Sequence, residues 1–158
     1  MNGPETAVEQ VWREHGARLW RSLVAYTGDP EVASDAMAEA FAQALGRGDA
    51  VHDHAAWIWR ASFKIAAGEL ARRRRSATIG PAPSGSETLP EPVVDLVTAL
   101  RTLSPQQRGA TVLHDYADLP TREVARILGC TPATVRVHLL QARRRLRSLL
   151  EDDDDRST

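Results

Sequence analysis

The sequence predicts an all-α protein with two small helical domains joined by a flexible linker, the C-terminal domain being a helix-turn-helix. Apolar residues recur near a 3.6-residue period on both sides of the linker, and no stretch shows the sustained alternation of a half-buried strand. The linker, residues 76–92, contains four Pro and two Gly and almost no large apolar side chain, so it cannot bury enough surface to fold alone. We therefore expect domains over residues 1–75 and 93–150, followed by an acidic tail at 151–158.

Three helices are expected in the N-terminal domain. The first ends at the Gly28–Pro30 breaker, and Pro30 suits the first turn of a second helix that runs to about Leu45. A third helix is expected from about Ala55 to Arg73. The inward-facing residues of the first two helices, all near helical spacing, are expected to be Val8, Val11, Trp12, Leu19, Leu23, Tyr26, Val32, Ala36, Ala40 or Phe41, and Ala44.

Four shorter helices are expected in the C-terminal domain. The first covers roughly residues 93–103. Ser104 is suited to be the N-cap of the second helix, with Pro105 as its first residue. The third helix is expected at Thr121–Leu128, and the fourth at about Pro132–Leu150.

The basic residues are concentrated in two segments, although the formal net charge of the chain is only −1. Residues 51–75 hold 6 Lys or Arg against 2 acidic residues, and residues 121–150 hold 7 Arg against 1 acidic residue. Two basic segments on an acidic background are typical of a nucleic-acid binder. Solvated helix faces would give the same composition, so charge alone leaves both interpretations open.

Composition excludes several classes of function. No run of about 18 apolar residues is present, so we expect no membrane segment, and the N-terminus lacks the basic and apolar regions of a signal peptide. The single cysteine, Cys130, suits a reducing compartment, so a cytoplasmic protein is expected. His52 and His54 have one residue between them and no cysteine nearby, so we expect no zinc site. No enzyme activity, catalytic residue, cofactor or small-molecule substrate is expected.

The strongest local motif is the segment LPTREVARILGCTPATVRVHLLQARRRL at residues 119–146. Thr121 is suited to cap a short helix, and Gly129 to end it in a left-handed turn. Pro132 starts a second helix, whose apolar stripe is expected to pack on the domain core. A turn of small residues between two short helices, with a polar face on the second, is typical of a DNA-binding helix-turn-helix. The expected stripe is Val135, Leu139, Ala142, Leu146 and Leu149.

The chemistry of the DNA grooves assigns roles to the polar face of that second helix. Arg136 suits bidentate reading of guanine, while Val137 and Leu140 lie off the apolar stripe and suit contact with a thymine methyl group. The alternative is a surface helix of a bundle whose arginines are merely solvated. The complete DNA-binding set expected for this motif is Thr121 and Arg122, placed for phosphate contacts, with Thr134, Arg136, Val137, His138, Leu140, Gln141 and Arg144 on the second helix.

With both halves in view, the chain resembles the extracytoplasmic-function sigma factors, the small two-domain class of bacterial sigma factors. The resemblance covers about residues 8–75 and 93–150. The stretch DPEVASDAMAEAF is similar to the family's polymerase-binding helix, and AAWIWRASFKIAAGELARRRR is similar to its helix for promoter melting and −10 recognition. Residues 100–147 look like the domain that reads the −35 element.

The resemblance implies a role for particular residues. Asp35 and Glu39, one helical turn apart, would bind the clamp of core RNA polymerase. Trp57 would belong to the core, and the GDAVHDHA loop at residues 48–55 would capture a flipped base of the −10 element. The implied −10 and melting residues are Trp59, Arg60, Phe63, Lys64, Arg72 and Arg73, with the two aromatic side chains exposed for stacking on unpaired bases.

The function implied by the resemblance is that of a sigma factor, which binds core RNA polymerase and directs promoter-specific transcription initiation. Its implied partners are core polymerase, promoter DNA and an anti-sigma factor. Family members usually carry a Ser-Arg pair where this chain has Val137 and His138, which implies an unusual promoter sequence. They also usually carry Gln where it has Ala38, on the polymerase-binding helix. Two alternatives stay open: a helix-turn-helix regulator that does not direct initiation, and a sigma-like adaptor that binds polymerase without melting DNA.

Overall fold

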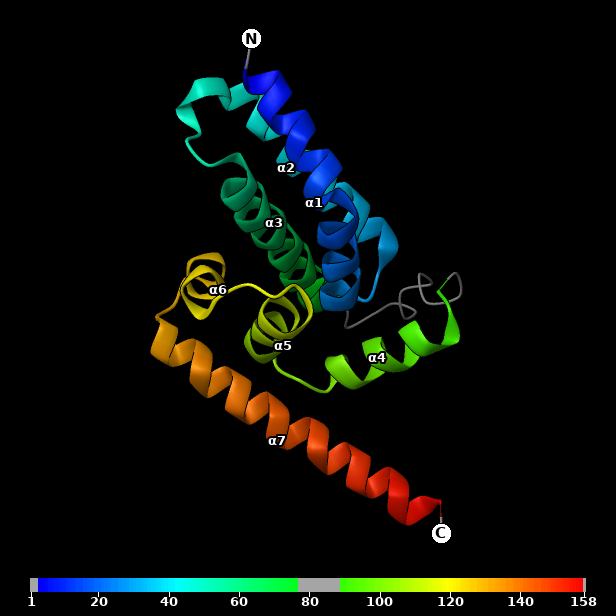
Figure 1. The fold of residues 1–158 in the computed structure, drawn as a ribbon. Helices are drawn as coiled ribbons and strands as arrows, with labels where there is room; N and C mark the ends of the chain where they lie inside the picture. Colours follow the sequence, from blue (N-terminus) through cyan, green and yellow to red (C-terminus); the bar gives the residue numbers. More distant parts are fainter. Residues whose placement is uncertain (1–2, 77–88, 158) are drawn as a thin grey trace.

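The computed structural model describes residues 3–76 and 89–157, and every regular element in these ranges is helical (Figure 1). The all-α prediction is therefore confirmed for the described residues, whereas most of the expected linker lies outside them. The helices α1 and α2 run antiparallel, and α3 packs against both. The N-terminal domain consists of α1 (Pro4–Thr27), α2 (Pro30–Arg47), a short 3₁₀ turn η1 (Gly48–Ala50) and α3 (His54–Ser76).

A glycine and an aspartate turn the chain between α1 and α2. Gly28 ends α1 with a φ of 71°, in the left-handed region that residues with a Cβ rarely adopt. The Asp29 carboxylate caps α2, because its Oδ1 accepts hydrogen bonds from the backbone N–H groups of Glu31 and Val32 at 2.9 and 3.3 Å. Its other oxygen accepts from Nη1 of Arg73 at 2.8 Å. One buried carboxylate thus links the start of α2 to the end of α3.

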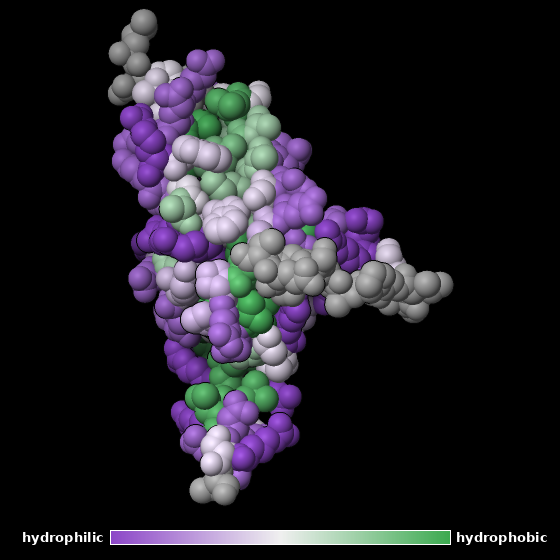
Figure 2. All heavy atoms as spheres, turned by 90° about the vertical axis from the view of Figure 1, so that its right-hand side faces the viewer, coloured by the Kyte–Doolittle hydropathy of each residue, from purple (hydrophilic) through white to green (hydrophobic). Residues whose placement is uncertain are grey.

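The core of the N-terminal domain follows the predicted apolar stripes with one exception. Trp12 is 55% exposed, so its predicted inward position is wrong. Its ring packs edge-on against Phe41, with 5.0 Å between the ring centres, and lines an open groove between α1 and α2. Figure 2 shows hydrophobic residues gathered on this face near the N-terminal end. The predicted residues that are buried are Val8, Val11, Leu19, Leu23, Tyr26, Val32, Ala36, Ala40, Phe41 and Ala44.

The C-terminal domain contains the four predicted helices, with changes at their ends. Ser104 caps the second of them in a capping box with Gln107, as its sequence position predicts. The predicted cap at Thr121 is wrong, because Pro120 occupies the N-cap position and Thr121 is the first helical residue. The elements are α4 (Glu91–Arg101), α5 (Pro105–Thr111), a π-helical turn η3 (Val112–Tyr116), α6 (Thr121–Leu128) and α7 (Pro132–Arg156).

The predicted acidic tail is not a separate segment in the described residues. Helix α7 continues through the acidic run to Arg156, six residues beyond the expected end at Leu150. No Gly or Pro follows Leu150 to stop the helix, and adding a turn to an existing helix is much easier than starting one. The acidic side chains therefore extend from the last turns of α7 into solvent.

The two domains pack against each other and share one continuous hydrophobic core. Helix α3 contacts α6, and α1 contacts α4 and η3 (Figure 1). Nη1 of Arg108 on α5 donates to the carbonyl oxygen of Tyr26 at 3.0 Å, and its guanidinium lies 5.8 Å from the centre of the Tyr26 ring. Arg101 on α4 donates to the carbonyl oxygen of Gly28 at 3.3 Å. The second domain thus covers the C-terminal end of α1, and the protein is in a closed arrangement.

Candidate nucleic-acid interface

The start of α7 is held by local signals and by the domain core. Gly129 ends α6 in the left-handed conformation, with a φ of 72°, as predicted. The Thr131 hydroxyl then caps α7 by accepting a hydrogen bond from the backbone N–H of Thr134 at 3.2 Å. Val135, Leu139 and Ala142 are buried, which anchors one face of α7 and leaves the opposite face outward. Farther along the predicted stripe, Leu146 and Leu149 are half-buried.

The outward face of α7 combines charged and apolar groups. Arg136, Leu140 and Arg144 are exposed and lie four residues apart, so they share one face. Val137 is 51% exposed and Leu140 is 50% exposed. A helix of a soluble protein that presents apolar side chains beside arginines, opposite its anchored face, has the chemistry to contact thymine methyl groups and guanine edges.

The other predicted residues of the helix-turn-helix lie at the edges of this face. Gln141 is exposed, and its Oε1 accepts a hydrogen bond from Nε2 of Gln107 at 3.1 Å. His138 is half-buried, and its Nδ1 is buried without a hydrogen-bond partner. Thr121 is half-buried while Arg122 is exposed, both in the first turn of α6. Thr134 shares a hydroxyl–hydroxyl contact with Thr131 at 2.9 Å. DNA contact by each of these residues stays a prediction.

Helix α3 turns its predicted stacking residues into the core. Trp59 and Phe63 are only 3% and 2% exposed, so the predicted stacking platform is wrong for the closed arrangement. Their rings stack on each other with 6.2 Å between centres, and Nε1 of Trp59 donates to Nδ1 of His15 at 3.3 Å. The spacing of Trp59, Phe63 and Ala66 is that of a core stripe, and Ala66 is fully buried.

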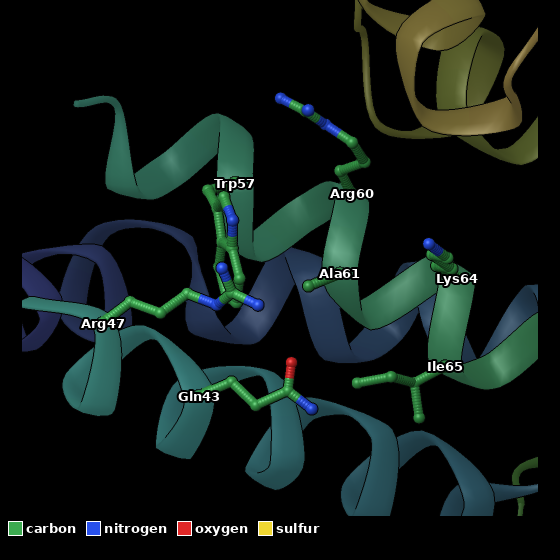
Figure 3. Close-up of a pocket in the computed structure, with 7 residues that line it drawn as sticks. All are labelled: Gln43, Arg47, Trp57, Arg60, Ala61, Lys64 and Ile65. Carbon is green, nitrogen blue, oxygen red and sulfur yellow. The ribbon is translucent and has the colours of Figure 1, made fainter. Parts of the chain in front are cut away.

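The exposed side of α3 instead forms a cationic groove against α2. Trp57, which the resemblance assigns to the core, is half-buried and lines this groove. The guanidinium of Arg47 lies 5.4 Å from the centre of the Trp57 ring, and Arg60 and Lys64 are exposed along the same side (Figure 3). The groove encloses about 490 Å³, and its lining residues are Gln43, Arg47, Trp57, Arg60, Ala61, Lys64 and Ile65. An aromatic edge among three cations suits an unpaired base and its backbone.

The arginines at the end of α3 are partly neutralised within the protein. Arg72 and Arg73 both donate to the carboxylate of Glu69, at 2.6 and 3.2 Å. The hydrogen bonds from these guanidinium groups, chiefly that from Arg72, lower the pKa of Glu69 to about 2. Arg73 is also bound to Asp29. The predicted phosphate contacts of Arg72 and Arg73 stay predictions, and in this structure both side chains serve the fold.

The predicted polymerase-binding residues lie together on the outside of α2. Asp35, Ala38 and Glu39 are all exposed, and the Glu39 carboxylate accepts a hydrogen bond from Nε2 of Gln43 at 2.9 Å. Asp35 and Glu39 line a hollow between α2 and α3. The described residues contain no cluster of three or more His, Cys, Asp or Glu side chains suited to a metal ion. None of the described helices is both long and apolar enough to cross a membrane.

The fold and these surfaces define a two-domain helix-turn-helix protein, and comparison with known proteins identifies its kind. A family model described as sigma-70, region 4 matches residues 94–146. The RNA polymerase sigma-E factor of Streptomyces avermitilis is 29% identical over 97% of this chain and 90% of its own length. The ECF RNA polymerase sigma factor SigM of Mycobacterium tuberculosis is 29% identical over 94% of this chain and 79% of its own. The chain is thus similar over most of its length to extracytoplasmic-function sigma factors, and its residues 94–146 match sigma-70 region 4.

Solved structures show the same fold. CnrH, in complex with the cytosolic domain of CnrY, superposes with a TM-score of 0.75 at 22% identity, over 94% of this chain and 90% of its own. The sigma factor RpoE of Bartonella quintana, in complex with the anti-sigma factor NepR, gives 0.70 at 23% identity, over 90% of this chain and 98% of its own. Both superpositions therefore span the two helical domains.

Proposed function

We propose that this protein binds core RNA polymerase and directs promoter-specific transcription initiation, and that no side chain performs a catalytic step. The observation that carries the proposal is the outward face of α7. It lies inside the segment matched by the sigma-70 region 4 model and presents Arg136, Val137, Leu140 and Arg144 to solvent. This face would enter the major groove at the −35 element, with Arg136 on a guanine and the two apolar side chains on thymine methyl groups.

The groove between α2 and α3 would serve the −10 element. A base leaving the duplex could stack on the exposed part of Trp57, while Arg60 and Lys64 hold the adjacent phosphates. This assignment replaces Trp59 and Phe63 as the stacking residues, because both are in the core. Opening of the duplex would then be driven by binding free energy gained on the distorted strand.

The outside of α2 would hold core polymerase. Asp35 and Glu39 are exposed acids on adjacent turns, so they suit basic groups on the polymerase clamp. Ala38 lies between them and supplies no polar group at the position where the family usually has Gln. Because complementary charge mainly speeds association, this contact should weaken as salt is raised.

The closed arrangement opposes reading of both promoter elements at once. The −35 and −10 elements lie about 25 base pairs apart, roughly 85 Å along a duplex that rises about 3.4 Å per base pair. Helix α7, with 25 residues, spans about 37 Å at 1.5 Å per residue. Helix α6 of the helix-turn-helix packs against α3, so we infer that the two domains separate when the protein acts with polymerase.

An anti-sigma factor is the partner that would oppose this separation. RpoE of Bartonella quintana, one of the structural neighbours, is itself bound to an anti-sigma factor. We propose that this chain also has such a partner, because a protein that holds the two domains together would block promoter reading without altering either surface.

Transcription in vitro with purified core polymerase tests the proposal. A pool of DNA templates should yield transcripts from a particular promoter sequence only when this protein is added. Arg136→Ala should relax the choice of one −35 base pair and cost about 1–3 kcal/mol in binding to the preferred site. DNA binding without initiation would make the protein a helix-turn-helix regulator. Polymerase binding without DNA binding would make it an adaptor, and either result contradicts the proposal.

A further inference from the structure

A pocket at the boundary between the two domains gathers four arginines. It lies where the ends of α1 and α3 meet α4 and α5 (Figure 1), and its volume is about 350 Å³. None of the four belongs to the outward face of α7. This arginine pocket is lined by Arg73 and Arg74 from α3, Arg101 from α4 and Arg108 from α5, with apolar surface from Leu70 and Pro105.

Carboxylates neutralise only one of the four arginines within the described parts of the chain. Arg73 pairs with Asp29 at 2.8 Å and with Glu69 at 3.2 Å. Arg74, Arg101 and Arg108 form no ion pair with a carboxylate in residues 3–76 or 89–157. Three guanidinium groups therefore meet at the pocket without a counter-charge from these ranges.

Arg108 is the most enclosed of these groups. Burial lowers the pKa of its guanidinium, and the positive charges of Arg74 and Arg101 lower it further, against an opposing effect of Tyr26. Its Nε is buried and has no hydrogen-bond partner. Its Nη1 and Nη2 donate only to main-chain oxygens, those of Tyr26 at 3.0 Å and Leu103 at 3.4 Å. This partly buried cation is therefore held by main-chain oxygens and by no carboxylate of residues 3–76 or 89–157.

The end of α1 balances part of this charge. Arg101 and Arg108 donate to carbonyl oxygens of Gly28 and Tyr26, where the helix dipole is equivalent to about half a negative charge. Against three guanidinium groups, this leaves an excess of about two and a half positive charges. Arg74 and Arg101 are exposed, whereas Arg108 is half-buried and has lost part of its hydration. An unbalanced charge in that position is costly, so a small anion in the pocket would be stabilised.

We propose that the arginine pocket binds a small anion carrying one or two phosphate groups. Planar guanidinium groups match phosphate oxygens in bidentate geometry, and Leu70 and Pro105 offer an apolar wall to the rest of the molecule. A pocket of this volume admits a small molecule and excludes a duplex. Because the arginines come from both domains, the anion favours the closed arrangement over the separated one. Its effect on transcription rests on the proposed function, whereas binding of the anion does not.

Calorimetric titration of the full chain with pyrophosphate, at constant ionic strength, tests the proposal. Arg101→Gln removes one pocket charge from an exposed position, and Arg21→Gln is its control, because Arg21 is an exposed arginine of α1 outside the pocket. We expect one saturable site in the wild type and in the control. Binding should be about tenfold weaker or worse in Arg101→Gln, since it loses a charge-assisted hydrogen bond. Pyrophosphate should also raise the thermal unfolding midpoint of the wild type and of the control variant more than that of Arg101→Gln.

Two results would overturn the proposal. The wild type could show no saturable site, or Arg101→Gln and Arg21→Gln could weaken binding equally, which would mean that pyrophosphate responds only to net charge. A parallel titration with duplex DNA identifies the alternative role of the arginines. If the wild type shows no saturable site and Arg101→Gln weakens duplex binding, the arginines contact the DNA backbone and no free anion binds. None of these titrations contains RNA polymerase, so failure of the proposed function would leave their outcome unchanged.

Discussion

Replacing Asp29 should destabilise the protein through two separate contacts. Its carboxylate caps α2 and also binds Arg73 of α3. Loss of an N-cap costs about 1 kcal/mol, and loss of a partly exposed ion pair costs up to about 1 kcal/mol. Asp29→Ala should therefore lower the free energy of unfolding by about 2 kcal/mol. For a chain of this length, that lowers the thermal midpoint by about 4–8 °C.

Two further variants separate the contacts. Asp29→Asn keeps the cap and loses the ion pair, so it should cost about 1 kcal/mol. Arg73→Gln should cost somewhat more, because it also loses the contact with Glu69. The double variant should cost little more than Arg73→Gln alone, because both single changes remove the same pair with Asp29. Arg75→Gln is the control, since Arg75 is an exposed arginine of the same helix with no ion pair among the described residues. Urea unfolding followed by circular dichroism measures the wild type and all five variants. A loss below about 0.5 kcal/mol for Asp29→Ala would refute the reasoning.

Three other predictions concern the surface and the pH response. Trp57→Ala should weaken binding of single-stranded −10 DNA by about 1–3 kcal/mol with little loss of stability. Trp59→Ala should instead cost about 3–5 kcal/mol of unfolding free energy, because it removes a core ring. If Trp59→Ala weakened DNA binding and Trp57→Ala lowered stability, Trp59 would be restored as the stacking residue. Arg136→Ala should change duplex affinity only for sequences altered at particular base pairs. Arg147→Ala should weaken binding of all duplexes and make the affinity less dependent on salt. If both variants changed the affinities for all sequences alike, base reading by Arg136 would be contradicted. The pKa of Glu69 is lowered to about 2, so its contribution to the free energy of unfolding is complete above its ordinary pKa of 4.5 and is lost as the pH falls toward 2. The free energies of unfolding of Glu69→Gln and the wild type should therefore converge near pH 2. A difference between them that grows on acidification would contradict the ion pairs.

Local signals in the sequence predict the helices and most of their ends. Ser104 and Gly129 act through groups within three or four residues of their own position, so the sequence contains the whole interaction. The apolar stripes succeed for the same reason, since helical spacing decides which side chains share a face. The predicted end of α7 at Leu150 is wrong, because no Gly or Pro after Leu150 interrupts the backbone hydrogen bonds of the helix.

The tryptophans show where sequence reasoning falls short. Trp12 lies on the edge of an apolar stripe, and whether α2 covers it depends on the angle between two helices, which spacing does not specify. The family resemblance predicts Trp59 at the surface, although its spacing from Phe63 and Ala66 indicates a core stripe. Giving spacing priority over resemblance places Trp59 in the core and leaves the half-buried Trp57 as the aromatic residue that lines the groove.

The contact between the two domains has no local signature. Arg108 and Tyr26 are 82 residues apart, and no pattern around either residue indicates the other. No pattern around Gly28 indicates its contact with α4 either, although an added Cβ at Gly28 would lie 2.9 Å from Val97 and 2.7 Å from Arg101. Only the folded structure reveals that the second domain requires a glycine at the end of α1, and the arginine pocket exists only because of that contact.

Promoter opening is the most direct measure of the central claim that this protein directs initiation. Thymines that become unpaired react with permanganate, so a footprint on a selected promoter reports melting at single-base resolution. With core polymerase and this protein together, thymines near the −10 element should become reactive, and Arg136→Ala should abolish the signal on promoters that depend on the −35 base pair. Polymerase alone, or the protein alone, should leave the duplex protected. A stable ternary complex whose −10 thymines stay unreactive would contradict the claim.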